Sequence, residues 1–250
     1  MEEEAHIVKR AIIMAAGTGK RMQPLTFKIP KPLVKVNGVR MLDTVVDGLR
    51  TNGITEIYVV VGHLKEQFFE WGKEKGVHYI ENPYYNTCNN ISSLYVAREH
   101  LGECIILDGD QIIYNPAVLD KHFTISGYNA VWCEDETDEW LMKVEDGVVK
   151  SCSRTGGSRG WQLYSISRWT AEDGEKLRRH LEYEFDRGNR QIYWDDVVMF
   201  CHFKDYRLGI RQMQKNDIIE IDGLDELVAI DHSYQAYLQK QEKEEDKSNE

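Results

Sequence analysis

The chain has 250 residues, of which 42% are hydrophobic, enough for one large domain or one domain with a small insertion. A formal net charge of −11 argues against a general nucleic-acid-binding protein, which would present a basic face. No segment approaches the roughly 18 apolar residues of a membrane helix. The start MEEEAHIVKR is unlike a secretory signal. The five cysteines are scattered without close pairs. We therefore expect a cytoplasmic protein with reduced thiols, no membrane span and no nucleic-acid partner, while the oligomeric state stays open.

The first half of the chain alternates between two patterns. Continuous apolar runs predict strands at residues 10–15, 56–62, 77–82 and 103–110, and segments with an apolar stripe predict helices at 41–53, 64–76 and 92–102. Buried strands that alternate with helices favour a parallel sheet covered on both faces. We therefore predict an α/β fold with a Rossmann-like, mostly parallel sheet and helices on both faces.

The second half of the chain changes character. Shorter, more alternating segments predict antiparallel strands at 128–135, 140–146, 148–154 and 161–168, with a hairpin turn at 145–149. A helix at 170–187, strands at 206–213 and 217–222, and a last helix at about 223–240 follow. Residues 241–250 are charged and apolar-free, so we expect them to form a disordered tail.

Small residues and cations follow the first predicted strand, in the stretch AIIMAAGTGKRMQPLTFKIPKPL. Successive backbone N–H groups of a glycine-containing loop can bind an anion, and this loop consists of Ala15, Ala16, Gly17, Thr18 and Gly19. Arg21 and Lys31 carry the charge to neutralise phosphates, and the neighbouring prolines stiffen the segment of Lys31. On the glycines alone, a polar loop with a chance cluster of cations is the stronger interpretation, because neither common phosphate-binding motif is present.

The full pattern, A-A-G-x-G-x-R-M-x-P-L-T followed by P-K-P-L, resembles the signature of the sugar-phosphate nucleotidyltransferases. These enzymes transfer a nucleoside monophosphate from an NTP to a phosphorylated acceptor and release pyrophosphate. The commonest form of the signature has Gly-Gly where this chain has Ala16 and Gly17. The resemblance implies that the loop backbone, Arg21 and Lys31 hold the triphosphate. It also implies that the two cations are catalytic, because they stabilise charge on the phosphates during displacement.

Two acids end the strand predicted at 103–110, in the segment ILDGDQ. Open α/β sheets bind ligands at the carboxyl ends of their strands, and Asp108 and Asp110, two residues apart, share a face. Mg²⁺ takes carboxylate oxygens together with substrate phosphates, so we predict Asp110 as a magnesium ligand and Asp108 as part of the nucleotide site. The candidates for a converging second ligand are Asp195, Asp196, Glu220 and Asp222. We prefer Asp222, because it also ends a predicted strand.

The segment NPYYNTCNNISSL at 82–94 is rich in Asn and Ser. Their side chains both donate and accept hydrogen bonds, as a pyrimidine edge requires. We predict that Asn89, Asn90 and Ser92 read the base, opposite the backbone of Ala15 and Gly17. Capping of the following helix is an equally good interpretation, above all for Asn90 and Ser92.

Five of the six tryptophans lie between positions 132 and 194, in the half expected to bind the acceptor. Aromatic faces beside carboxylates suit a quaternary ammonium, which cannot donate hydrogen bonds and is held by cation–π attraction. The segments DEWLM and QIYWDD supply as candidates Trp140, Tyr193, Trp194 and Asp195. For any single tryptophan, an ordinary place in the core is the stronger interpretation.

Further segments look like those of bacterial phosphocholine cytidylyltransferases, namely VGHLKEQF, NNISSLY, LDGDQ, DEWLM, YWDDVV and IIEID. The match covers about residues 9–240 and implies one nucleotidyltransferase domain, with a nucleotide-binding half at 9–125 and an antiparallel acceptor-binding half at 126–222. The implied reaction converts CTP and phosphocholine to CDP-choline and pyrophosphate, with Mg²⁺, by in-line attack of the acceptor phosphate. The implied choline pocket contains Trp140, Tyr193, Trp194, Asp195 and Glu220.

One segment departs from that pattern. RTGGSRGWQLYS at 154–165 carries Arg154, Arg159 and Trp161, which are candidates for binding an acceptor phosphate or phosphonate. The partners expected are therefore CTP and a small phosphorylated amino-alcohol or phosphonate. Cytidylyl transfer to 2-aminoethylphosphonate or phosphoethanolamine stays open, because a primary ammonium prefers hydrogen bonds to acids. A sugar phosphate acceptor and a non-catalytic nucleotide sensor are further alternatives, and the intact cations and acids argue against the sensor.

Overall fold

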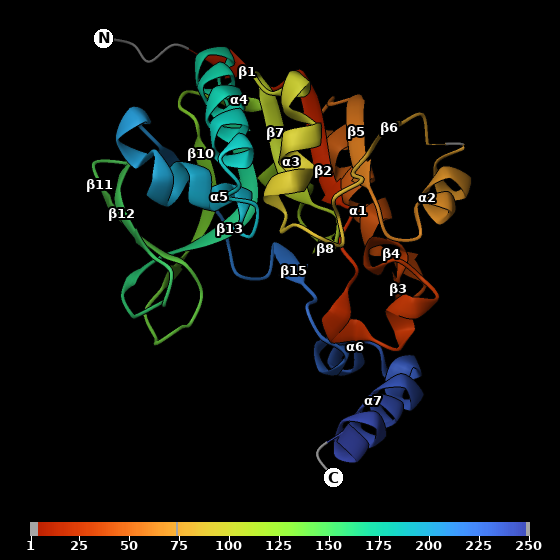
Figure 1. Ribbon diagram of the computed structural model, residues 1–250. Helices are drawn as coiled ribbons and strands as arrows, with labels where there is room; N and C mark the ends of the chain where they lie inside the picture. The colour runs from red at the N-terminus through yellow and green to blue at the C-terminus, as the bar shows by residue number, and fades with distance from the viewer. Residues whose placement is uncertain (1–4, 74, 249–250) are drawn as a thin grey trace.

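A computed structural model describes residues 5–73 and 75–248 of the chain. Figure 1 shows a sheet running through the molecule with helices packed against it. In order of pairing, its strands are β10 (Gly127–Cys133), β14 (Gly209–Gln212), β12 (Val148–Ser153), β11 (Leu141–Glu145), β13 (Gly160–Trp169), β7 (Cys104–Asp108), β2 (Arg10–Ala15), β5 (Glu56–Val61) and β6 (His78–Glu81). The predicted α/β architecture is confirmed.

The strands β6, β5, β2 and β7 form the parallel part of this sheet. Successive side chains of β2 point to opposite faces, so Ala11 and Ile13 pack in one core cluster while Ile12 and Met14 pack in another. Because both faces bury apolar side chains, these strands are apolar along their length. The helices that cover the first face are α1 (Met41–Thr51) and α2 (Lys65–Gly72), and those that cover the second are α3 (Ile91–Val96) and α4 (Ala171–Asp186).

The antiparallel strands of the second half belong to the same sheet. β13 pairs with β7 and thereby joins the two halves. β10 pairs with both β13 and β14, and β11 and β12 complete a closed ring of paired strands. The pairing of β10 with β14 is parallel, unlike the others in this ring. The predicted hairpin between β11 and β12 is present, and Asp146 and Gly147 form its turn with positive φ.

A third core cluster joins an early segment of the chain to a late one. Met22 and Leu25, which follow β2, pack with Ile221 and Leu224, which follow β15 (Ile218–Glu220). β15 pairs with β8 (Gln111–Ile113) in a separate small sheet, so the acids after β7 and those at the end of β15 meet. The remaining strands and helices are β1 (His6–Ile7), β3 (Lys35–Val36), β4 (Val39–Arg40), β9 (His122–Phe123), α5 (Trp194–Asp196), α6 (Leu224–Ile230) and α7 (Gln235–Ser248).

The last helix differs from the prediction. The segment expected as one helix over 223–240 breaks into α6 and α7, and α7 continues to Ser248 through residues that we expected to be a disordered tail. The Gln, Lys and Glu residues of this segment are good helix formers, which explains the extension. The helix predicted at 92–102 is shorter, because α3 ends at Val96 and a 3-10 turn follows. None of the helices within 5–73 and 75–248 is long and apolar enough to cross a membrane.

Candidate active site

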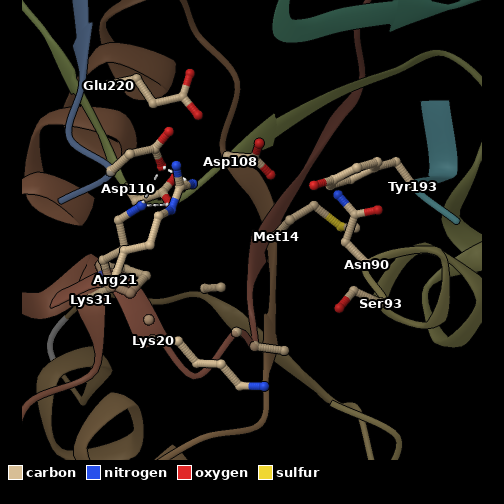
Figure 2. Close-up of a pocket in the computed structure, with 16 residues that line it drawn as sticks. Met14, Lys20, Arg21, Lys31, Asn90, Ser93, Asp108, Asp110, Tyr193 and Glu220 are labelled. Carbon is tan, nitrogen blue, oxygen red and sulfur yellow. Dashed lines mark hydrogen bonds and ion pairs between the residues drawn. The ribbon is translucent and has the colours of Figure 1, made fainter. Parts of the chain in front are cut away.

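A cavity of about 320 Å³ opens at the carboxyl ends of β2 and β7 (Figure 2). Parallel strands direct their carboxyl ends to one edge of a sheet, where open α/β folds bind ligands. In Figure 2, Arg21, Lys31, Asp110 and Glu220 lie on one side of this cavity, Asn90, Ser93 and Tyr193 lie on the other, and Asp108 lies between the two groups. The cavity therefore brings together the glycine loop and most of the acids predicted from the sequence.

The glycine loop follows β2 directly and turns at Gly19, whose φ is +62°. A Cβ atom at Gly19 would lie 2.8 Å from Thr26 Cγ2 and 3.3 Å from Lys31 Cβ. Glycine is thus required both for the left-handed backbone and for space. The Thr26 hydroxyl donates a hydrogen bond of 2.8 Å to the Gly19 carbonyl and holds the turn. At Gly17, by contrast, the space beside Cα is open, so a ligand can approach the backbone there.

Lys31 is the centre of an ion-pair network in this cavity. Its Nζ atom lies 2.7 Å from Asp110 Oδ2 and 2.9 Å from Asp222 Oδ1. Arg21 Nη2 reaches the same Asp222 oxygen at 2.8 Å, although the Arg21 side chain is largely exposed. Burial would lower the pKa of Lys31, but the two carboxylates outweigh burial and raise it above its ordinary value. Lys31 is therefore charged at neutral pH, as phosphate binding requires.

Asp108, Asp110 and Glu220 cluster beside this network, with one oxygen of each within 4.8 Å of the others. Burial and the charge of Asp110 raise the pKa of Asp108 to about 7. Desolvation within this crowded site and the charges of Asp110, Asp108 and Asp222 raise the pKa of Glu220 well above its ordinary value. Carboxylates crowded in this way attract a cation.

A divalent cation fits these acids. Asp110 Oδ1 is buried and has no hydrogen-bond partner among the described residues. Mg²⁺ takes carboxylate oxygens as ligands, and three of them converge here. Glu220, which the resemblance assigned to the acceptor pocket, thus stands with Asp108 and Asp110. Asp222, the predicted second ligand, lines the same cavity, but its Oδ1 atom is engaged by Lys31 and Arg21.

A second cavity, of about 380 Å³, adjoins the first at the glycine loop. Ala16, Gly17 and Asn90 line both cavities, and Thr18 lines the second. Its opposite wall belongs to the segment 82–93, which includes Asn89 and Ser92. The structure therefore brings the predicted base-reading segment opposite the glycine loop.

The polar side chains of this wall hold one another in place. The buried Asn82 donates hydrogen bonds of 3.0 Å to the hydroxyls of both Ser92 and Ser93. Ser92 donates in turn to the Asn89 carbonyl at 2.8 Å, so its hydroxyl serves the local structure. Asn90 Oδ1 accepts a hydrogen bond from the backbone N–H of Trp194 at 2.8 Å and ties the wall to α5. The Asn90 side chain makes no capping bond to α3.

Sequence reasoning missed Lys20, Asn82 and Ser93. Lys20 lines both cavities, and its charge inside the glycine-loop motif was a signal that could have identified it. Asn82 and Ser93 lie in the Asn- and Ser-rich segment 82–94, but the pattern did not single them out, because their contact depends on how the chain after β6 packs against α3.

Two of the predicted acceptor residues, the exposed Tyr193 and the half-buried Trp140, form an aromatic wall. Tyr193 is 51% exposed and lines the first cavity, and Trp140 packs edge-on against it with ring centroids 6.1 Å apart. Phe200 lies in a π-helical turn at Val197–Cys201, and its ring centroid is 5.2 Å from that of Trp140. The predicted Arg154 lies over Phe200 and near Trp140. The sequence pattern did not identify Phe200.

Trp194 and Asp195, which the resemblance placed in the choline pocket, are both buried. For Trp194 this agrees with the interpretation that a single tryptophan takes an ordinary place in the core. The Trp194 ring packs against Tyr128 and Trp169, with centroid distances of 6.1 and 6.0 Å. It belongs to the core because α5 turns it inward onto the sheet. Burial and the charge of Asp108 raise the pKa of Asp195 well above its ordinary value.

Arg159 and Trp161 lie apart from the aromatic wall. Arg159 is 75% exposed, and its nearest ion-pair partner is Glu134 at 3.8 Å. Trp161 packs edge-on against Trp132 across the pairing of β10 and β13, with centroids 5.4 Å apart. Neither residue lines the two cavities, so the structure does not bring these predicted acceptor residues to the nucleotide site.

Known proteins resemble this chain over most of its length. Residues 11–189 match the family model described as the MobA-like NTP transferase domain. A 2-aminoethylphosphonate cytidylyltransferase of Lancefieldella rimae is 37% identical over 228 residues, which is 90% of this chain and 92% of that protein. A choline-phosphate cytidylyltransferase of Streptococcus pneumoniae is 34% identical over 223 residues, 86% of this chain and 93% of that protein. The solved structure of CTP:phosphocholine cytidylyltransferase from Streptococcus pneumoniae has a TM-score of 0.80 and 30% identity, covering 89% of this chain and 97% of that one.

Proposed function

The chain belongs to the MobA-like NTP transferase family, and from this premise we propose that it transfers CMP from CTP to a short phosphonate or phosphate that carries an amino group. Our first candidate acceptor is 2-aminoethylphosphonate. The products would be the acceptor joined to CMP, and pyrophosphate. The observation that carries the proposal is the network of Arg21 and Lys31 with the acids at the glycine loop. Cations and a loop backbone open to a ligand are what binding of a triphosphate needs.

The proposed chemistry is a direct displacement at phosphorus. An ionised oxygen of the acceptor attacks the α-phosphorus of CTP, and a new O–P bond forms. The bond from that phosphorus to the oxygen that bridges to the β-phosphate breaks, and its electron pair leaves with pyrophosphate. Lys31 and Arg21 offset the negative charge on the phosphates, and the glycine loop holds them in line.

The three clustered acids are the proposed metal site. Mg²⁺ held by Asp108, Asp110 and Glu220 would draw phosphate oxygens together and neutralise part of their charge. The buried, unpartnered oxygen of Asp110 supports this assignment.

The base and the acceptor are proposed to occupy opposite sides of the triphosphate. The wall at 82–93 supplies amide and hydroxyl groups suited to cytosine, with Asn89 and Asn90 as the main candidates. The acceptor would lie toward Tyr193. Phosphocholine, which the sequence alone puts first, is the second candidate acceptor, because Trp140 and Tyr193 offer aromatic faces to a quaternary ammonium.

The test is pyrophosphate release from CTP and Mg²⁺ across an acceptor panel of 2-aminoethylphosphonate, phosphoethanolamine, phosphocholine and glucose 1-phosphate. We expect turnover with an amino-phosphonate or amino-phosphate, a slower reaction when UTP replaces CTP, and loss of turnover in the Asp110→Asn variant. Fastest turnover with the sugar phosphate would contradict the proposal. Saturable CTP binding without turnover of any acceptor would instead support a non-catalytic nucleotide sensor.

A further inference from the structure

An aromatic and acidic box adjoins the cavity at Tyr193. We call Trp140, Phe200 and Asp196 the cation box. The Trp140 and Phe200 rings meet edge-to-face with centroids 5.2 Å apart. Asp196 is 4% exposed, and its Oδ2 atom accepts a hydrogen bond of 2.8 Å from the backbone N–H of Tyr193. Two aromatic faces beside a buried carboxylate form a binding place for an organic cation.

The chain fills this box with a cation of its own. The Arg154 guanidinium carbon lies 4.0 Å from the Phe200 ring centroid and 5.9 Å from that of Trp140. Arg154 Nη2 also lies 2.5 Å from Asp196 Oδ1, so the guanidinium meets both the aromatic faces and the carboxylate. Its side chain is still 49% exposed, which means that it closes the box from the solvent side.

The contacts of Arg154 with Asp196 and the two rings decide which acceptor headgroup can displace its guanidinium from the cation box. A guanidinium combines a planar face for stacking with N–H donors for the carboxylate. A trimethylammonium group would have to displace Arg154 from its ion pair with Asp196. Its methyl groups would hold its charge farther from the carboxylate than the guanidinium nitrogen, which lies 2.5 Å from Asp196 Oδ1, so the new ion pair would be weaker. A primary ammonium needs no aromatic box, because it can hydrogen-bond to carboxylates and carbonyls elsewhere along the cavity.

Resting on the proposed cytidylyl transfer, we propose that Arg154 is a specificity-determining residue that occupies the cation box and excludes a quaternary ammonium headgroup. The acceptor class that this arrangement admits is a short phosphonate or phosphate with a primary ammonium. In this proposal Arg154 acts on the headgroup of the acceptor, whereas the sequence made it a candidate for binding the acceptor phosphate or phosphonate.

The Arg154→Met variant tests the proposal. Methionine is uncharged and flexible, so it removes the guanidinium from the box, leaves Asp196 without its ion-pair partner, and can move aside for an external cation. In the wild type, we expect kcat/KM for 2-aminoethylphosphonate to exceed that for phosphocholine. In the variant, that ratio should shift roughly tenfold toward phosphocholine, mainly through KM, the size of change that a desolvated cation–π contact supplies. Lys150→Met, which removes an exposed charge from β12, should leave the ratio unchanged.

Binding of tetramethylammonium chloride, followed by calorimetry, gives a readout that needs no turnover. The variant should bind this probe about tenfold more tightly than the wild type. If Arg154→Met does not fold because Asp196 is left unpaired, the double variant Arg154→Met/Asp196→Asn removes the ion pair as a unit and keeps both aromatic faces; it too should bind the probe more tightly. An unchanged acceptor ratio together with equal probe affinity would overturn the proposal, as would a wild type that prefers phosphocholine. Absence of turnover with every acceptor would count against the proposed function alone, since probe binding still decides the role of Arg154.

Discussion

Lys31 is oriented before any ligand arrives. It begins a 3-10 turn at Lys31–Leu33 between Pro30 and Pro32, which restrict the backbone around it. Its side chain is 9% exposed, and its charge is compensated by Asp110 and Asp222. Removing one partner of a buried ion pair typically costs about 3–5 kcal/mol. Lys31 thus shares Asp110 with the proposed metal site and is held from the other side by Asp222, so a triphosphate would meet an ammonium that is already in position.

The Lys31→Met variant should lose most of its activity. We expect kcat/KM for CMP transfer to fall by about 10²–10³-fold, the usual effect of removing one group that stabilises developing charge. Steady-state pyrophosphate release measures this loss. Lys35→Met is the matched control, because Lys35 is exposed in the neighbouring β3 and should tolerate the change. Near-wild-type turnover in Lys31→Met, or an equal loss in both variants, would contradict the role given to Lys31.

At the scale of elements, α7 returns to the segment that carries Arg21. Tyr237 and Leu238 pack against the core cluster of Met22 and Leu25. Gln241 Nε2 donates a hydrogen bond of 3.2 Å to the Arg21 carbonyl, across 220 positions of sequence. The helix thus supports the loop that presents a phosphate-binding cation, and its docking is coupled to the shape of the nucleotide site.

Undocking α7 should raise KM for CTP more than it lowers kcat. In a Tyr237→Ser/Leu238→Ser variant we expect KM for CTP to rise about tenfold, equivalent to roughly 1.4 kcal/mol, because a looser loop must be ordered on binding. The value of kcat should change less, since the loop contacts ground state and transition state alike. Gln239→Ser, an exposed position of the same helix, is the control. If hydrogen exchange shows α7 undocked while KM for CTP is unchanged, the coupling is absent.

The elements that could be predicted from the sequence are those marked by an apolar pattern or a motif within a short segment. Buried strands such as β2 and β5 are apolar on both faces, and Arg21, Lys31 and Asp110 lie in motifs, so each could be assigned without coordinates. The pairing of β8 with β15 could not, because three-residue strands show no periodicity, and that pairing is what brings Glu220 to Asp108. The cation box was equally hidden, since it depends on a π-helical turn that brings Phe200 to Trp140.

At the scale of the whole molecule, one sheet runs through both halves, and helical segments outside it hold the acceptor half together. α4 packs against the π-helical turn that carries Phe200. His180 of α4 stacks on His202, which follows that turn, with ring centroids 3.9 Å apart and planes 7° from parallel. His180 Nδ1 also lies 2.8 Å from the Tyr206 hydroxyl, and His202 Nε2 lies 3.0 Å from the buried Glu184 carboxylate. Through these contacts the protonation of His180 is linked to the stability of the acceptor half.

We expect the protein to lose stability as the medium becomes acidic, in part through His180. Burial and the neighbouring His202 lower the pKa of His180, against the opposing charge of Asp205. Between that lowered value and the unfolded value of about 6.5, the unfolded chain binds more protons than the folded one. The contribution is therefore fully present above about pH 6.5 and is lost as the pH falls through the folded-state pKa. Urea unfolding at about pH 8 and about pH 5.5 measures the change in the free energy of unfolding.

The His180→Gln variant isolates this contribution, because glutamine does not titrate yet can still hydrogen-bond to the Tyr206 hydroxyl. Its loss of unfolding free energy between the two pH values should be smaller than that of the wild type. His232→Gln changes an exposed histidine and should keep the wild-type loss. Carboxylates such as Asp205, 3.6 Å from His180 Nε2, are present in all three proteins and largely cancel in the comparison. An equal loss in all three would assign the acid sensitivity to the carboxylates and remove the histidine stack from it.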